Sequence, residues 1–140
     1  MIGSGNLYKE VEEYIEQNDL KNVIKITSFL DNPYKYMKNA KVLLMPSIYE
    51  GFGLVAVEAM LLGLPVVCFP VGGLKEIINE NCGIICKSEN DMIEALKKLL
   101  INEKLRMDIS KFAKNEALKY CNTGLYKMKL EKIYQEIMKG

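Results

Sequence analysis

Residues 46–60 hold the side chains whose types and spacing could do chemistry. Gly51 and Gly53 precede an apolar stretch of helical character, and Glu58 is the only charged residue within positions 54–62. Glycine lets a ligand approach the backbone closely, and the free N–H groups at the start of a helix attract phosphate. The segment therefore predicts a cradle for a diphosphate.

Carboxylates stand at both ends of this cradle. The helix that carries Glu58 is otherwise apolar on all sides, which is typical of a buried helix. An unpaired carboxylate is costly there, so Glu58 either has a buried partner or faces a cleft and holds a polar ligand. Glu50 lies in the loop, where a solvated acid is common. Together the two carboxylates could hold both ends of a nucleotide sugar.

Strands and helices on either side must position this loop. Residues 42–45 form a continuous apolar run, as in a strand buried on both faces, and residues 54–62 are expected to form a helix that ends at Gly63. Residues 65–69 and 83–85 predict two further strands, with helical turns at 74–78 between them. Strands alternating with helices indicate a parallel sheet, and ligands of such sheets bind beyond the carboxyl ends of the strands.

The flanking regions predict more helices. Residues 6–18 have helical periodicity, residues 23–27 are β-branched and predict a strand, and a short helix is expected to start at residues 31–33. Ser88 and Asp91 resemble a capping box at the start of the first of three C-terminal helices. Each of these helices has an apolar stripe that we expect to pack into the core: Met92, Ile93, Leu96, Leu99 and Leu100; Leu105, Ile109, Phe112 and Ala113; Leu125, Met128, Ile133, Tyr134 and Ile137.

Composition excludes several classes of function. The 140 residues fit one domain, and 19 basic against 18 acidic residues give no electrostatic reason to expect a nucleic-acid partner. The chain has no histidine, which removes histidine triads and histidine metal sites, and Arg106 is its only arginine. Cys82 and Cys86 alone do not close a zinc site, so we expect reduced, mostly buried thiols in a cytosolic protein.

Residues 50–58 match the E-x(7)-E motif of retaining glycosyltransferases, in particular those of family four in the carbohydrate-enzyme classification. The neighbouring residues resemble that family over nearly the whole chain, and they include Pro46-Ser47, Glu58-Ala59-Met60, Gly63-Leu64-Pro65-Val66-Val67, and Gly72-Gly73 with Glu76. The resemblance implies an α/β fold with a Rossmann-like parallel sheet flanked by helices, the C-terminal half of a GT-B glycosyltransferase.

The resemblance also implies roles for individual residues. Glu50, the candidate catalytic residue, would accept hydrogen bonds from hydroxyls of the donor sugar, and Glu58 would hold the ribose hydroxyls. The diphosphate and sugar would meet the backbone of Gly51, Phe52, Gly53 and Leu54, while Ser28 and Phe29 would lie near the base. Gly72 and Gly73 line the same crevice in family members.

As a whole, the resemblance implies transfer of a glycosyl group from a nucleoside diphosphate sugar, with retention, in bacterial polysaccharide or glycolipid synthesis. No cofactor is expected, and the sequence has no Asp-x-Asp motif of the metal-dependent class. Residues 1–140 would be a partial donor-binding domain, with the acceptor domain and the first strand and helix on a missing segment or a separate chain. The sequence does not identify the acceptor. The expected location is the cytoplasm, with peripheral contact to the inner membrane face.

Three alternatives stay open at this point. A nucleotide-sugar-binding module or remnant without turnover would keep the same site, and the chain on its own is expected to bind donor weakly and to transfer poorly. A flavodoxin-like signalling domain would have acidic residues at several strand ends, which the sequence lacks. Non-hydrolysing sugar epimerases share the two-domain architecture but use other catalytic residues, and the absence of histidine weakens that hypothesis.

Overall fold

The computed structural model describes residues 1–138, except for the side chain of Leu125. The chain separates into two compact units, Met1–Tyr36 and Met37–Gly140. Within the described residues, no helix combines the length and apolar character needed to cross a membrane.

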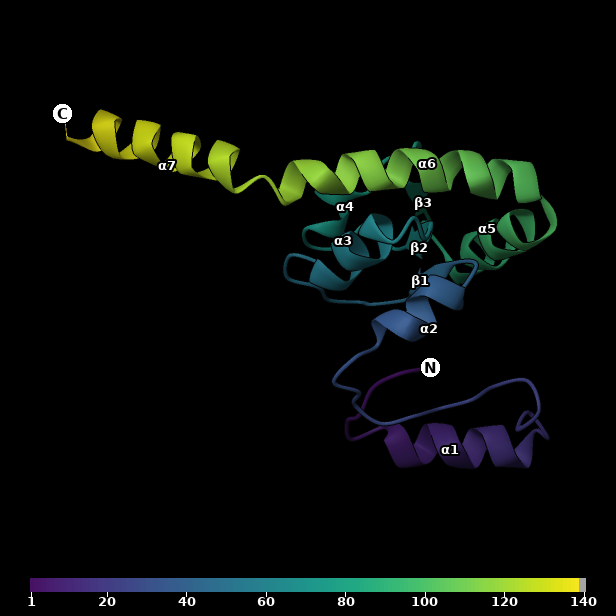
Figure 1. Cartoon of the computed structure of the whole chain (residues 1–140). Coiled ribbons are helices and arrows are strands. Elements are labelled where there is room, and N and C mark those ends of the chain that lie inside the picture. Colours follow the sequence, from purple (N-terminus) through teal and green to yellow (C-terminus); the bar gives the residue numbers. More distant parts are fainter. Residues whose placement is uncertain (139–140) are drawn as a thin grey trace. The chain divides into compact units, whose positions relative to one another are not determined.

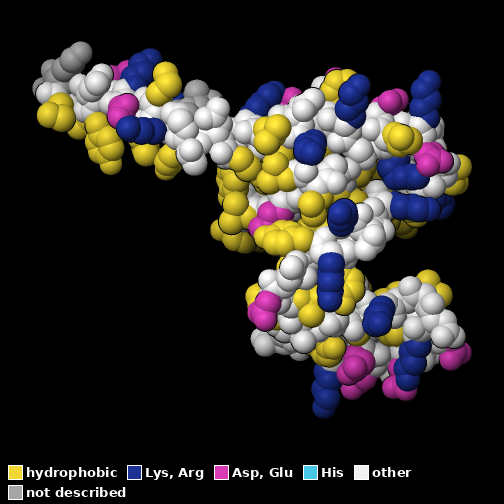
Figure 2. Space-filling model, in the orientation of Figure 1, with side chains coloured by type: hydrophobic (Ala, Val, Ile, Leu, Met, Phe, Trp, Pro, Cys, Tyr) yellow, Lys and Arg dark blue, Asp and Glu magenta, His cyan; other side chains and the backbone are white. Residues whose placement is uncertain are grey.

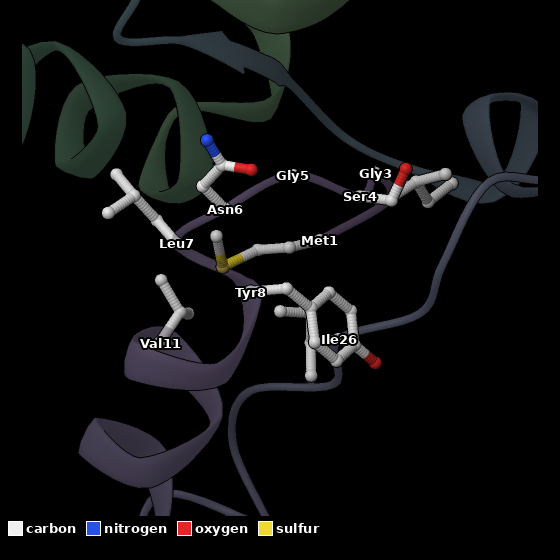
Figure 3. A pocket seen from close by; sticks show the side chains of 10 residues that line it. Met1, Gly3, Ser4, Gly5, Asn6, Leu7, Tyr8, Val11 and Ile26 are labelled. Atoms are coloured by element: carbon white, nitrogen blue, oxygen red, sulfur yellow. The ribbon is translucent and has the colours of Figure 1, made fainter.

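The N-terminal unit is built around α1 (Tyr8–Gln17), which confirms the helix expected at residues 6–18. Ile15 is the buried residue of this helix. An open apolar cavity of about 370 Å³ lies against the start of α1, and Leu7, Tyr8, Val11 and Ile26 are among the side chains that line it (Figure 3). This cavity lies wholly within the N-terminal unit.

The strand predicted at residues 23–27 is wrong. A single parallel bridge joins Thr27 to Ile2, and no strand forms there in the described chain. The backbone N–H groups of Val23 and Ile24 instead donate to the carbonyl of Leu20 at 2.9 and 2.8 Å. Because these N–H groups are used in turn hydrogen bonds, they cannot pair with a neighbouring strand. Val23 is left largely exposed.

The C-terminal unit contains a parallel sheet in the order β1-β2-β3, formed by β1 (Leu43–Met45), β2 (Val66–Cys68) and β3 (Gly83–Ile85). Helix α3 (Leu54–Leu61) connects the first two strands and α4 (Leu74–Ile77) the next two. The sequence prediction of a parallel sheet alternating with helices is therefore confirmed. Helix α2 (Tyr34–Asn39) precedes the sheet, and the Asn32 side chain accepts a hydrogen bond from the Tyr34 N–H at 3.2 Å.

Strand β1 departs from the prediction that it is buried on both faces. Leu44 is 40% exposed, whereas all three residues of β2 are fully buried. The reason is position in the sheet, since β1 lies at its edge and β2 in its centre. An apolar run therefore predicted the strand correctly but could not distinguish an edge strand from a central one.

Alternating residues of β2 point into two cores, one on each face of the sheet. Val66 and Cys68 belong to the core formed with α3, α4 and α6 (Glu103–Tyr120). Val67 belongs to the core formed with α5 (Glu89–Ile101) and Ile109. Helices thus cover both faces of the sheet, with α6 packed against α3 (Figure 1).

The helix start predicted at Ser88 is confirmed, whereas part of the predicted packing of the C-terminal helices is wrong. The Ser88 Oγ accepts from the Asp91 N–H at 3.1 Å, as a capping box requires. Six residues of the predicted core stripes on α5, α6 and α7 (Thr123–Ile137) are, however, half or more exposed: Leu100, Phe112, Met128, Ile133, Tyr134 and Ile137. The side chain of Leu125, from the same predicted stripe as Met128, lies outside the described residues. Figure 2 shows hydrophobic side chains along one side of α7.

Candidate functional site

The loop between β1 and α3, residues 46–53, lies at the carboxyl end of β1, where the sequence places the chemistry. We call it the glycine loop. It ends at Gly53, the N-cap of α3, whose backbone is left-handed with φ +90°. A side chain at Gly53 would be strained by this φ, and its Cβ would lie 2.7 Å from Cδ2 of the buried Leu74. Glycine is therefore required for the loop to enter the helix at this angle.

A second turn, residues 70–73, follows the carboxyl end of β2 and contacts the glycine loop. The Gly73 N–H donates to the Gly51 carbonyl at 2.7 Å. A Cβ at Gly72 would overlap the carbonyl oxygen of Glu50, and a Cβ at Gly73 would overlap that of Phe52. Both glycines are thus needed for the backbone of this turn to lie directly against the backbone of the glycine loop. They therefore do more than form a turn.

The start of α3 is not capped by a side chain in the described structure. The carbonyl of Gly53 accepts from the N–H groups of Ala56 and Val57, which leaves the N–H groups of Leu54 and Val55 at the uncapped helix start. Such N–H groups, together with the positive end of the helix dipole, favour an anion. The two elements that the sequence predicted, a glycine-containing loop and a helix start directly behind it, are present.

The two carboxylates occupy different parts of this cradle. Glu50 is half-buried in the glycine loop, and its Cγ lies near the helix start, 3.8 Å from where a Cβ would stand on Gly53. Glu58 is half-buried one helical turn after Leu54, on the same face of α3. Glu58 has an interaction partner within the chain, so its burial does not by itself require a ligand.

Helix α3 is not buried all round, contrary to the prediction from its apolar sequence. Ala56, Val57, Ala59 and Met60 are buried, but the face that carries Glu58 also presents Leu54, which is 65% exposed. Figure 2 shows hydrophobic side chains gathered over α3 and the loop before it, with acidic groups among them. The apolar residues of this face therefore belong to an open surface around the candidate site.

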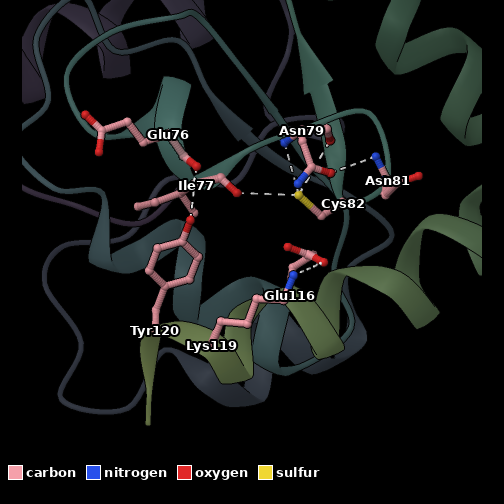
Figure 4. A network of polar contacts seen from close by, with 8 residues as sticks. All are labelled: Glu76, Ile77, Asn79, Asn81, Cys82, Glu116, Lys119 and Tyr120. Atoms are coloured by element: carbon pink, nitrogen blue, oxygen red, sulfur yellow. Dashed lines mark hydrogen bonds and ion pairs between the residues drawn. The ribbon is translucent and has the colours of Figure 1, made fainter. Parts of the chain in front are cut away.

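Tyr120, the last residue of α6, contacts the site and was missed by the sequence reasoning. Its ring meets the ring of Phe52 edge-on, with centroids 6.1 Å apart. Its hydroxyl donates to the carbonyl of Glu76 at the end of α4, at 3.0 Å (Figure 4). Burial raises the pKa of the Tyr120 phenol above its ordinary value. The sequence does contain an indication of this contact, because Tyr120 follows Ala113 and Ala117 at helical spacing and therefore lies on the same face of α6.

The single arginine of the sequence is bound to the end of a helix. The single arginine, Arg106, donates to the carbonyl of Leu99 at 2.8 Å and so satisfies the end of α5. Lys75, on α4, is exposed. The arginine of this chain therefore has a structural role.

The remaining predicted site residues, Ser28 and Phe29, lie in the N-terminal unit, where both are exposed. A second cavity, of about 400 Å³, lies beside β3 and is lined by residues such as Glu80, Ile85 and Lys98. Neither of the two cavities described here is lined by the glycine loop. The candidate site is therefore described from the backbone of the glycine loop and the start of α3, within the C-terminal unit.

The buried cysteines confirm the expectation of reduced thiols. Cys68, Cys82 and Cys86 are free and buried, whereas Cys121 is free and exposed. Burial raises the pKa of the Cys68 thiol to about 11, so this thiol is protonated and unreactive at neutral pH.

Comparison with known proteins gives this geometry a context. The chain is 33% identical over 98% of its length to an uncharacterized glycosyltransferase of Methanocaldococcus jannaschii. Over 84% of its length it is 31% identical to the Campylobacter jejuni enzyme N-acetylgalactosamine-N,N'-diacetylbacillosaminyl-diphospho-undecaprenol 4-alpha-N-acetylgalactosaminyltransferase. The chain spans 40% of the first relative and 33% of the second.

The fold has solved counterparts. The crystal structure of HepE from Anabaena in complex with UDP-glucose superposes with a TM-score of 0.81 at 21% identity, and covers 96% of this chain and 40% of HepE. This likeness shows the fold, which is the Rossmann-like half of a GT-B glycosyltransferase, as predicted. The family model for glycosyl transferases group 1 matches residues 1–116. The chain therefore belongs to the group 1 glycosyltransferase family.

Proposed function

We propose that residues 1–140 are a donor-binding domain that holds a nucleoside diphosphate sugar on the glycine loop and the start of α3. Joined to an acceptor domain, it transfers the glycosyl group with retention. The observation that carries the proposal is the uncapped start of α3, presented by a loop that two glycines of a second turn fix in place.

The physical reason is the charge that develops during the reaction. When the bond between the anomeric carbon and the diphosphate breaks, negative charge collects on the leaving phosphate. N–H groups already oriented toward that phosphate stabilise the charge without reorganising, and they lower the barrier. We propose that the N–H groups of Leu54 and Val55, at the uncapped start of α3, take this role. We assign no protein nucleophile, and Glu50 and Glu58 are not proposed as the acid and base of a glycosidase.

The two carboxylates would select the rest of the donor. Glu58 lies one turn along α3 from the proposed phosphate position, where it could accept hydrogen bonds from ribose hydroxyls. Glu50, beside the helix start, could accept hydrogen bonds from hydroxyls of the transferred sugar. Hydrogen bonds to a charged acceptor typically contribute about 1.5–3 kcal/mol, enough to decide between donor and free phosphate. Ser28 and Phe29 stay proposed as contacts to the base.

The relatives support a nucleotide donor and a glycan acceptor. HepE, of the same fold, is described in complex with UDP-glucose, and the Campylobacter relative is named for transfer to a diphospho-undecaprenol-linked sugar. We therefore propose a role in bacterial polysaccharide or glycolipid synthesis. A lipid-linked acceptor of this kind would place the protein in the cytoplasm, at the inner face of the membrane.

Titration with UDP-glucose tests the proposal. Binding is followed by isothermal titration calorimetry for the wild-type chain, for Glu58→Gln, and for Glu80→Gln as a control at an exposed carboxylate outside the proposed site. Loss of one charged acceptor should weaken binding about tenfold in Glu58→Gln and leave the control unchanged. Equal affinities in all three proteins would remove Glu58 from the ribose role.

A binding module without turnover is the second candidate, and the position of Arg106 favours it. Because that arginine satisfies the end of α5, this chain lacks a guanidinium group for the diphosphate. The two candidates separate when an N-terminal half is supplied, as a fusion or a second chain. Glycosyl transfer by the reconstituted protein supports the enzyme, and donor binding without transfer supports the module.

A further inference from the structure

We propose that Tyr120 is a positioning residue for the glycine loop, acting through Phe52 and Glu76. The inference rests on the proposed donor site and adds a residue to it. Tyr120 is 68 positions from Phe52 in the sequence (120 against 52), yet its ring lies against the Phe52 ring. It is therefore the point at which α6 reaches the loop.

The contacts form a closed triangle around the loop. Phe52 in the glycine loop touches the ring of Tyr120, and the Tyr120 hydroxyl donates to the carbonyl of Glu76 at the end of α4. The third side joins the loop to the turn that precedes α4, through the hydrogen bond from the Gly73 N–H to the Gly51 carbonyl. Figure 4 shows the Tyr120 hydroxyl directed at this end of α4. Together these three contacts restrict the movement of the glycine loop.

Tyr120 is held in place, because α6 packs firmly against the core. Ala113 and Ala117, on the preceding turns of α6, are completely buried against the same core as α3 and β2. Small side chains at these positions let α6 approach α3 closely. The position of Tyr120 is therefore set by the core, and the exposed glycine loop takes its position from Tyr120.

Three substitutions separate the two contacts that Tyr120 makes. Tyr120→Phe keeps the ring against Phe52 and removes the hydroxyl, whereas Tyr120→Leu removes both the ring and the hydroxyl. Tyr126→Leu is the matched control, since it makes the same change on α7 at a side chain that is 66% exposed. Protection of the Gly73 amide against hydrogen exchange, in the free chain, reports directly whether the loop is held.

We expect Tyr120→Leu to raise the exchange rate of the Gly73 amide about tenfold while amides of β2 keep their protection. UDP-glucose should bind about fivefold more weakly to this variant, and Tyr120→Phe should fall between it and the wild type. Unchanged protection of the β2 amides is the result that a general loss of stability would not give, because global unfolding would expose β2 as well.

The proposal is overturned if the Gly73 amide exchanges at the wild-type rate in Tyr120→Leu, or if Tyr126→Leu has the same effect as Tyr120→Leu. If Tyr120→Leu does not fold, the Tyr120→Phe variant decides on the hydroxyl contact by the same two readouts. A wild-type chain that binds no UDP-glucose contradicts the proposed function alone, because the exchange rate still decides whether Tyr120 holds the loop.

Discussion

Substitution of Gly72 by alanine should open the candidate site without touching its polar side chains. Gly72 has a left-handed backbone with φ +50°, and a Cβ there would overlap the carbonyl oxygen of Glu50. The loop carbonyl and the turn cannot both keep their places when that atom is present. We expect the glycine loop to move away from the turn, and Glu50 to move with it.

The expected cost follows from separate terms. An alanine in the left-handed region costs about 1–2 kcal/mol. Displacement of the loop also breaks the hydrogen bond from the Gly73 N–H to the Gly51 carbonyl, worth about 1 kcal/mol. The lower entropy of the unfolded alanine chain offsets about 0.4–1 kcal/mol. The free energy of unfolding should therefore fall by about 2 kcal/mol.

Gly51→Ala is the matched control, because no heavy atom beyond its own two chain neighbours lies within 4 Å of where its Cβ would stand. Its effect on the free energy of unfolding should stay within about 0.5 kcal/mol. Urea denaturation of both variants measures stability, and calorimetric titration with UDP-glucose measures binding. We expect Gly72→Ala to bind about tenfold more weakly, since displaced loop atoms no longer meet the donor.

The reasoning is refuted if Gly72→Ala unfolds at the wild-type urea concentration with an unchanged m value. Wild-type affinity for UDP-glucose in a clearly destabilised Gly72→Ala variant would show that the loop position is not what binds the donor. A similar loss of stability in Gly51→Ala would show that the loop is sensitive to any side chain.

Three further predictions concern the thiols, a helix cap and metal ions. Because the pKa of Cys68 is raised to about 11 in the folded chain from an ordinary value of 9.0, its contribution to stability is complete below pH 9 and is lost as the pH rises to 11. Urea denaturation across this range should show a loss of roughly 3 kcal/mol from this thiol, and a flat profile would contradict its burial. Ser88→Ala should lower the free energy of unfolding by about 1 kcal/mol through loss of the cap on Asp91, and an unchanged midpoint would contradict the cap. UDP-glucose should bind with the same affinity in EDTA as in Mg²⁺, since the sequence has no Asp-x-Asp motif, and a tenfold gain with Mg²⁺ would refute metal independence.

Local patterns predicted the elements whose structure is decided within a few residues. The apolar run at β2, the glycine after α3 and the cap at Ser88 each act through near neighbours, and each was found where the sequence placed it. The glycine loop followed from the same kind of signal, since an N-cap glycine and an adjacent helix are neighbours in the chain.

Features that depend on distant partners were not predicted. Leu44 is exposed because no described strand pairs with the outer side of β1. An apolar run alone does not indicate whether a strand lies at the edge or in the centre of a sheet. The contact between Phe52 and Tyr120 joins residues that are far apart in the sequence, so only the packing of α6 on α3 creates it. The same holds for Gly72, whose necessity appears only when the glycine loop lies on it.

A crystal structure of the chain soaked with UDP-glucose tests the central claim most directly. The account predicts a diphosphate within hydrogen-bonding distance of the Leu54 and Val55 N–H groups, with the ribose beside Glu58 and the glucose beside Glu50. A donor bound in the cavity next to β3, with the start of α3 left empty, would contradict it.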